Sequence, residues 1–117
     1  MSDRHVNYLS SDSLRGTDVV NGQGENIGSL EELMLDLGNG RVAYAVLSYG
    51  GLLGVGNKLF ALPWQAMRVD QDNKEIVVNV DKELLENAPG FDKDNWPQSS
   101  SPEWIADIHS YYGYSYN

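Results

Sequence analysis

Apolar and polar positions alternate over residues 18–80 in a way that predicts short β-strands separated by turns. The clearest strand covers residues 41–49, RVAYAVLSY, which are rich in β-branched and aromatic side chains. Further strands are predicted at residues 18–21, 58–62, 67–70 and 75–80. About six short strands in some sixty residues is the spacing typical of a small β-barrel or sandwich.

Residues 27–37 carry two conflicting signals. Ser29-Leu30-Glu31-Glu32 has the form of a helix capping box. The alternation of Leu33, Leu35 and Leu37 favours a strand instead, and Gly38-Asn39-Gly40 then provides a hairpin turn. Because the hairpin partner of residues 41–49 must itself be a strand, we predict a strand over 27–37. A register slip of one residue would expose the three leucines together.

The pattern changes after Val80. A short helix capped by Asp81 is predicted at residues 82–87, followed by an irregular arm at 91–97 and a serine-rich linker at 98–102. A second helix is predicted at residues 103–112. Its spacing places Trp104, Ile108, Tyr111 and Tyr112 on one side. We therefore expect a β-domain over residues 1–85 and a C-terminal arm over 86–117 that is not an independent domain.

Composition narrows the function classes. The 117 residues contain 17 acidic and 8 basic side chains, a net charge of −9, which opposes binding to nucleic acids and to anionic membranes. Cysteine is absent from the sequence, which excludes disulfides and thiolate chemistry and is compatible with a reducing compartment. The N-terminus has no apolar segment typical of a signal peptide, and no apolar run is long enough to span a membrane. We expect a cytoplasmic protein.

Residues 51–56, GLLGVG, have the glycine spacing of a phosphate-binding P-loop. That motif requires a lysine next, where this chain has Asn57, and a helix afterwards, where a strand is predicted. We interpret the glycines as a structural reversal between two strands. Leu52, Leu53 and Val55 would then either cover an open end of the barrel or be exposed to a partner.

Motifs for metal binding or catalysis are incomplete. His5 and His109 are isolated in the sequence and are interpreted as surface residues. The sequence from Asp92 to Asn95 begins like a calcium loop, but Trp96 and Pro97 occupy positions that should supply ligands. There is no G-x-S-x-G nucleophile motif. We expect no catalytic residue, no cofactor and no metal.

Aromatic residues are concentrated near the C-terminus, where they could pack on the chain's own barrel or form an intersubunit or partner contact. Together with the apolar residues of the glycine-rich segment and Phe91, they form the candidate partner or self-association surface. Its members are Leu52, Leu53, Val55, Phe91, Trp96, Trp104, Tyr111, Tyr112, Tyr114 and Tyr116.

Residues 40–64, GRVAYAVLSYGGLLGVGNKLFALPW, closely resemble the PRC-barrel family. So do residues 14–21, LRGTDVVN, with GENIG at 24–28 and Asp36 after them, so that the likeness covers residues 8–85. The family includes the cytoplasmic domain of the photosynthetic reaction centre H subunit and the C-terminal domain of a bacterial ribosome-maturation factor. The sequence is similar to stand-alone bacterial members, without the membrane helix of the first or the RNA-associated domain of the second.

The resemblance implies a small β-barrel that docks onto larger assemblies without catalysis. We therefore expect an all-β fold: a small, mostly antiparallel PRC-type β-barrel of about six strands with a C-terminal short helix and aromatic arm. The expected function is a non-catalytic protein-interaction or assembly module that forms a homodimer. A small-ligand-binding barrel with a stress-related role is the alternative, although a barrel of about six strands is normally filled by its own side chains.

Overall fold

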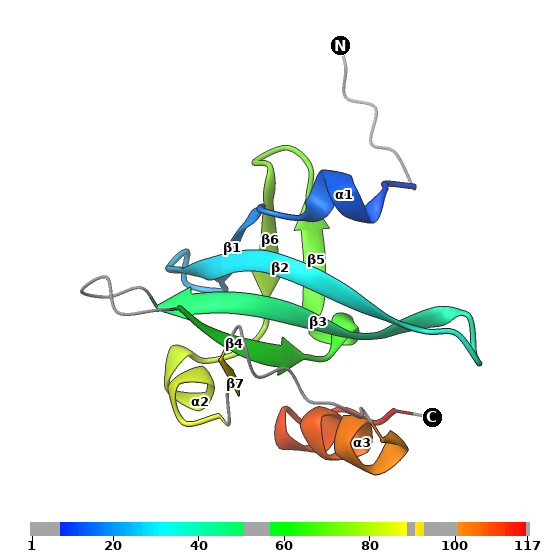
Figure 1. The fold of residues 1–117 in the computed structure, drawn as a ribbon. Helices are drawn as coiled ribbons and strands as arrows, with labels where there is room; N and C mark the ends of the chain where they lie inside the picture. The colour runs from blue at the N-terminus through cyan, green and yellow to red at the C-terminus, as the bar shows by residue number, and fades with distance from the viewer. Residues whose placement is uncertain (1–7, 51–56, 89–90, 93–100, 117) are drawn as a thin grey trace.

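The computed structural model describes residues 8–50, 57–88, 91–92 and 101–116. Its strands form one seven-stranded sheet in the order β5-β6-β1-β2-β3-β4-β7 (Figure 1). The strands are β1 (Asp18–Asn21), β2 (Asn26–Asp36), β3 (Arg41–Gly50), β4 (Asn57–Leu62), β5 (Met67–Asp70), β6 (Glu75–Val78) and β7 (Phe91–Asp92). The helices are α1 (Ser11–Leu14), the 3-10 helix η2 (Trp64–Ala66), α2 (Lys82–Glu86) and α3 (Pro102–Tyr111).

The sheet is mixed. β1 pairs with β6 in parallel, whereas the other pairings in the described ranges are antiparallel. Within those ranges no pairing joins the edge strands β5 and β7. The β-rich fold is thus confirmed, while the sheet is an open one as far as it is described. The prediction of an irregular arm over residues 91–97 is wrong for its first two residues. Phe91 pairs with Leu59 of β4, and Asp92 pairs with Lys58.

The predicted hairpin of residues 27–37 with 41–49 is confirmed, since β2 pairs with β3 from Ser29↔Ser48 to Asp36↔Arg41. The expectation that its leucines share a buried face is wrong. Leu33 packs against the core, but Leu35 is 63% exposed and Leu37 88% exposed. The register shifts between Met34 and Leu35, which interrupts the alternation, and the hairpin tip extends beyond the neighbouring strands (Figure 1).

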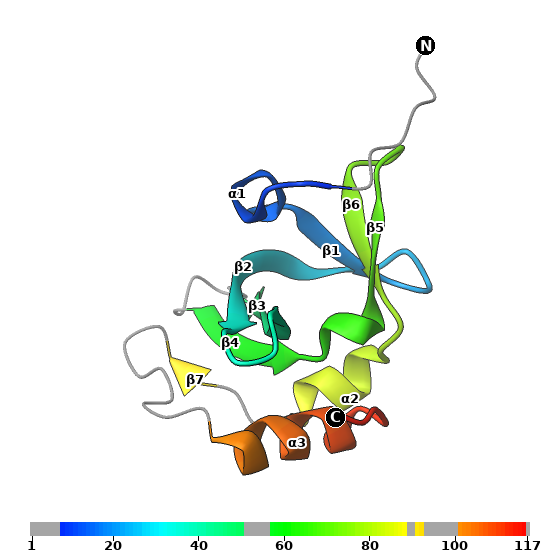
Figure 2. The same ribbon diagram turned by 90° about the vertical axis from the view of Figure 1, so that its right-hand side faces the viewer.

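Irregularities in β2 pairing help the sheet to curve. Register shifts occur against β1 near Val19 and against β3 near Leu30, and such bulges bend a strand and increase its twist. Figure 2 shows β5 and β6 standing across β2, β3 and β4. The curved sheet encloses the inner cluster, which consists of Leu14, Val19, Ile27, Leu30, Ala45, Leu47, Phe60, Leu62, Ala66, Ile76, Val78, Val80 and Leu85.

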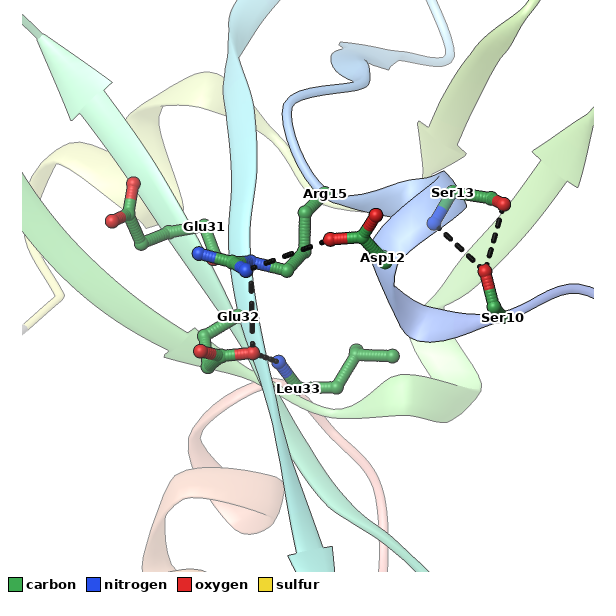
Figure 3. Close-up of polar contacts among 7 residues, drawn as sticks. All are labelled: Ser10, Asp12, Ser13, Arg15, Glu31, Glu32 and Leu33. Atoms are coloured by element: carbon green, nitrogen blue, oxygen red, sulfur yellow. Dashed lines mark hydrogen bonds and ion pairs between the residues drawn. The ribbon is translucent and has the colours of Figure 1, made fainter.

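Helix α1 was not predicted from the sequence, although Ser10 is a suitable N-cap whose hydroxyl accepts a hydrogen bond from the Ser13 amide. Arg15 joins this helix to β2 (Figure 3). Its guanidinium lies 3.9 Å from an Asp12 carboxylate oxygen and 3.8 Å from Glu32, and its Nε donates to the Glu31 carbonyl at 3.2 Å. Exposed ion pairs of this kind contribute little stability.

Candidate functional site

Helix α3 covers the outer face of β3 and β4, opposite the inner cluster (Figures 1 and 2). Strand β3 therefore contributes Ala45 and Leu47 to the inner cluster and Tyr44 and Val46 to the outer one. Coverage of both faces explains why the apolar run of β3 is buried without alternation. The outer cluster consists of Ala43, Tyr44, Val46, Leu59, Ala61, Ile105 and Ile108.

The ends of α3 follow standard capping chemistry. The Ser101 hydroxyl accepts a hydrogen bond from the Trp104 amide at 3.1 Å, and Pro102 occupies the first turn. At the other end Gly113 has a φ of +85°, and the Tyr114 amide donates to the His109 carbonyl at 2.8 Å. The predicted helix is confirmed with its bounds moved by one residue. The glycine turns the chain back along α3.

The predicted side of α3 is confirmed in part, because Ile108 is buried and Trp104 and Tyr112 are partly buried against the clusters. Ile105, Ile108 and His109 are its buried residues, whereas Tyr111 is 37% exposed and its hydroxyl donates to the Leu84 carbonyl. The interpretation of His109 as a surface residue is wrong. Its side chain is fully buried because it follows Ile105 by four residues and therefore lies on the same side of the helix. Its Nδ1 lies 2.8 Å from the Ile105 carbonyl.

Tyr116 fastens the C-terminal segment to the tip of the β2–β3 hairpin. Its ring lies 4.8 Å from the His109 ring, between centroids, and 4.1 Å from the Arg41 guanidinium carbon. Its hydroxyl donates a hydrogen bond to Asp36 Oδ2. A second contact of this segment is the hydrogen bond that the Gln65 side chain donates to the Ser115 carbonyl at 3.4 Å.

Asp36 organises the turn of this hairpin. Its Oδ1 accepts hydrogen bonds from the amides of Gly38 at 3.0 Å and Asn39 at 3.1 Å. Its Oδ2 accepts from the Asn39 side chain at 2.9 Å as well as from Tyr116. The Tyr116 hydroxyl, followed by the Asn39 donors, lowers the pKa of Asp36 to about 2. The carboxylate is thus ionised and has a donor at each of its four acceptor positions.

We expect the hydrogen bonds of Asp36 to stabilise the fold in a pH-dependent way. The lowered pKa means that their contribution is complete above the ordinary carboxyl pKa of 3.8 and is lost as the pH falls towards 2. The difference in melting temperature between wild type and Asp36→Asn should therefore shrink between about pH 5 and pH 2. Carboxyl NMR titration should also show a higher Asp36 pKa in Tyr116→Phe. An unchanged titration there would contradict the assigned role of the tyrosine hydroxyl.

A hollow of about 380 Å³ lies between the hairpin and the start of α3. We call it the hairpin groove. Leu35 and Leu37 contribute the most exposed apolar side chains among its lining residues. The lining residues are Met34, Leu35, Asp36, Leu37, Asn39, Ala43, Tyr44, Pro102, Ile105 and Tyr116.

The residues of the predicted interaction surface fall into four groups. Trp104, Tyr112, Tyr114 and Tyr116 are partly buried against the apolar clusters, and Tyr111 lies at the surface beside α2. Phe91 belongs to β7. Leu52, Leu53, Val55 and Trp96 lie outside the described residues. Sequence reasoning missed the groove, although two leucines beside a Gly-Asn-Gly turn are a usable signal of exposed apolar surface.

The lining of the groove combines apolar side chains with the polar groups of Asp36, Asn39 and Tyr116. Among the described residues, no group of three or more His, Cys, Asp or Glu side chains could hold a metal ion. The helices in those ranges are also too short or too polar to cross a membrane.

The sequence matches the PRC-barrel domain family over residues 7–85. Among solved structures, the chain is similar to a putative 16S ribosomal RNA processing protein, RimM, from Pseudomonas aeruginosa. The identity is 18% and the TM-score 0.45, with 71% of this chain and 50% of that chain covered. This chain thus spans about half the length of that protein. A search of curated proteins found no match.

Proposed function

The chain belongs to the PRC-barrel family, and from this membership we propose that it is a non-catalytic protein-interaction or assembly module. The observation that carries the proposal is the exposure of Leu35 and Leu37 beside the hairpin groove. Large apolar side chains that are exposed together beside one groove favour an interaction site on a soluble domain. The resemblance of residues 40–64 to family members that dock onto larger assemblies supports the same function.

The proposed scaffold is a PRC-type barrel over residues 1–85, with residues 86–117 as an arm that depends on it. Support comes from the outer cluster, in which Ile105 and Ile108 pack against strand residues rather than against a core of their own. The inner cluster consists of apolar side chains of the protein itself. This favours the proposed function over the alternative, a barrel that holds a small ligand in its interior. The proposed location of the module is the cytoplasm, with which the absence of cysteine is compatible.

Cross-linking in the native cell, followed by mass spectrometry, tests the module. We expect one recurrent protein partner whose cross-links depend on the hairpin, because the exposed leucines are the proposed contact. The Leu35→Ser/Leu37→Ser double variant should lose that partner, whereas Leu84→Ser, at a leucine 37% exposed on α2, should keep it. The proposal would be contradicted if the double variant and Leu84→Ser recovered the partner in equal amounts. It would also be contradicted if the wild type gave no recurrent partner.

We further propose that the chain self-associates through the candidate partner or self-association surface defined in the sequence analysis. The net charge of −9 opposes contact between two copies, and added salt screens that repulsion. A homodimer should therefore tighten as salt rises, which sedimentation velocity at high micromolar protein concentration measures. A chain that remains monomeric at moderate salt would contradict self-association and leave binding to other proteins intact.

A further inference from the structure

Building on the proposed function, we propose that the hairpin groove binds a segment of another protein in which an apolar side chain is flanked by basic residues. Three features of the groove support this partner. They are its volume and lining residues, the exposure of Leu35 and Leu37, and the charged residues of the elements around it.

The groove has the size and lining of a site for an apolar side chain. Its volume of about 380 Å³ falls in the range typical of ligand sites, roughly 300–1,000 Å³. Met34, Ala43 and Ile105 supply apolar lining from three different elements, β2, β3 and α3. Leu35 and Leu37, exposed by 63% and 88%, extend this surface at the hairpin tip. A bound apolar group would remove both leucines from water.

The charge along the groove favours a basic partner. Asp36 is the one charged residue among those that line the groove. Strand β2 and helix α3, which supply half of the lining residues, contain acidic residues but no Lys or Arg. The basic residue of the neighbouring part of β3 is Arg41, which lies over the Tyr116 ring. Arg41 is the partner of Asp36 across the hairpin and offsets its charge, but the five acidic residues of β2 and α3 outnumber it. A cationic segment would therefore meet a net negative charge on these elements, which steers association and contributes to specificity.

The hydrogen bonds of Asp36 restrict the kind of cation that fits. Because Gly38, Asn39 and Tyr116 supply donors for all four acceptor positions, a dehydrated metal ion would have to displace protein donors. A lysine or arginine at the groove rim can instead interact with the carboxylate through space. The geometry thus favours flanking basic side chains over a metal ion. The net charge of −9 on every copy also favours such a partner over a second copy of this chain.

The test is an NMR titration of the full ¹⁵N-labelled chain with three seven-residue peptides. The first has Leu-Phe-Leu between two pairs of lysines, the second has Leu-Phe-Leu between two pairs of glutamates, and the third has Gly-Ser-Gly between two pairs of lysines. We expect the first alone to bind, with shift changes at the lining residues of β2, β3 and α3. Its Kd should rise at least about threefold when salt is raised from low to moderate concentration.

Matched variants locate the site. Leu35→Ser and Leu37→Ser should each raise the Kd of the first peptide at least tenfold, whereas Leu84→Ser should leave this Kd unchanged. Thermal melts verify that all three variants fold, as expected for exposed positions. Shift changes confined to another surface, equal binding of the glutamate peptide, or no binding of any peptide would each overturn the proposal. The proposal would also be overturned if a second copy of the chain occupied the groove. That complex would be recognised by its affinity, which should increase when salt is added.

These outcomes are separable from failure of the proposed function. If no peptide binds but the hairpin-dependent cross-linked partner persists, the assignment of basic and apolar chemistry fails and the interaction module stands. If the partner is absent as well, both proposals fail.

Discussion

Replacement of Gly28 by alanine is expected to destabilise the fold by about 3 kcal/mol or more. Gly28 lies in β2 with a φ of +141°, a conformation that residues with a side chain rarely adopt. A Cβ atom here would lie 2.2 Å from the Ser48 carbonyl oxygen and 3.1 Å from Leu47 Cδ1. Because the nearest atom belongs to the backbone of β3, relief requires the two strands to move apart. Urea denaturation of wild type and Gly28→Ala measures the loss.

Gly24→Ala is the matched control. Gly24 also has a positive φ, +82°, but a Cβ there would meet no atom within 4 Å. This control therefore measures the cost of a positive φ without a clash, about 1 kcal/mol at Gly24. An equal loss of unfolding free energy in both variants would show that the close approach of β2 to β3 contributes nothing.

Replacement of Tyr44 by alanine is expected to cost about 3–5 kcal/mol, the range for removing a large aromatic side chain from a core. Tyr44 is 1% exposed in the outer cluster, and its ring meets the Trp104 ring edge to face at a centroid distance of 5.2 Å. Loss of the ring would leave a cavity between β3 and α3. The free energy of unfolding and the indole N–H resonance of Trp104 report on the two elements.

Tyr8→Ala removes the same ring from a position that is 91% exposed, so it should change stability by no more than about 0.5 kcal/mol. If Tyr44→Ala cost no more than this control and left the Trp104 resonance unchanged, α3 would not cover the outer face of the sheet in solution. A normal stability with a shifted Trp104 resonance would instead indicate that the helix repacks over the gap.

Local sequence was sufficient for the elements whose signals lie within a few residues. The Gly-Asn-Gly turn beside a β-branched run predicted the pairing of β2 with β3, against the capping-box signal at Ser29. The strands around it follow from their β-branched content. Asp36 shows the limit of such reasoning, because its contacts with Gly38 and Asn39 are local while its contact with Tyr116 spans 80 residues.

The sequence by itself determined the family resemblance, the hairpin and most strand positions, because turn chemistry and side-chain alternation act over short distances. Only the tertiary structure decided which faces are covered. His109 is buried where α3 packs on the sheet, and Leu35 is exposed next to a register shift in the β2–β3 pairing, where it lines the hairpin groove. The parallel pairing of β1 with β6 joins segments more than fifty residues apart. Burial and long-range pairing depend on the contacts of the whole fold, which no local pattern encodes.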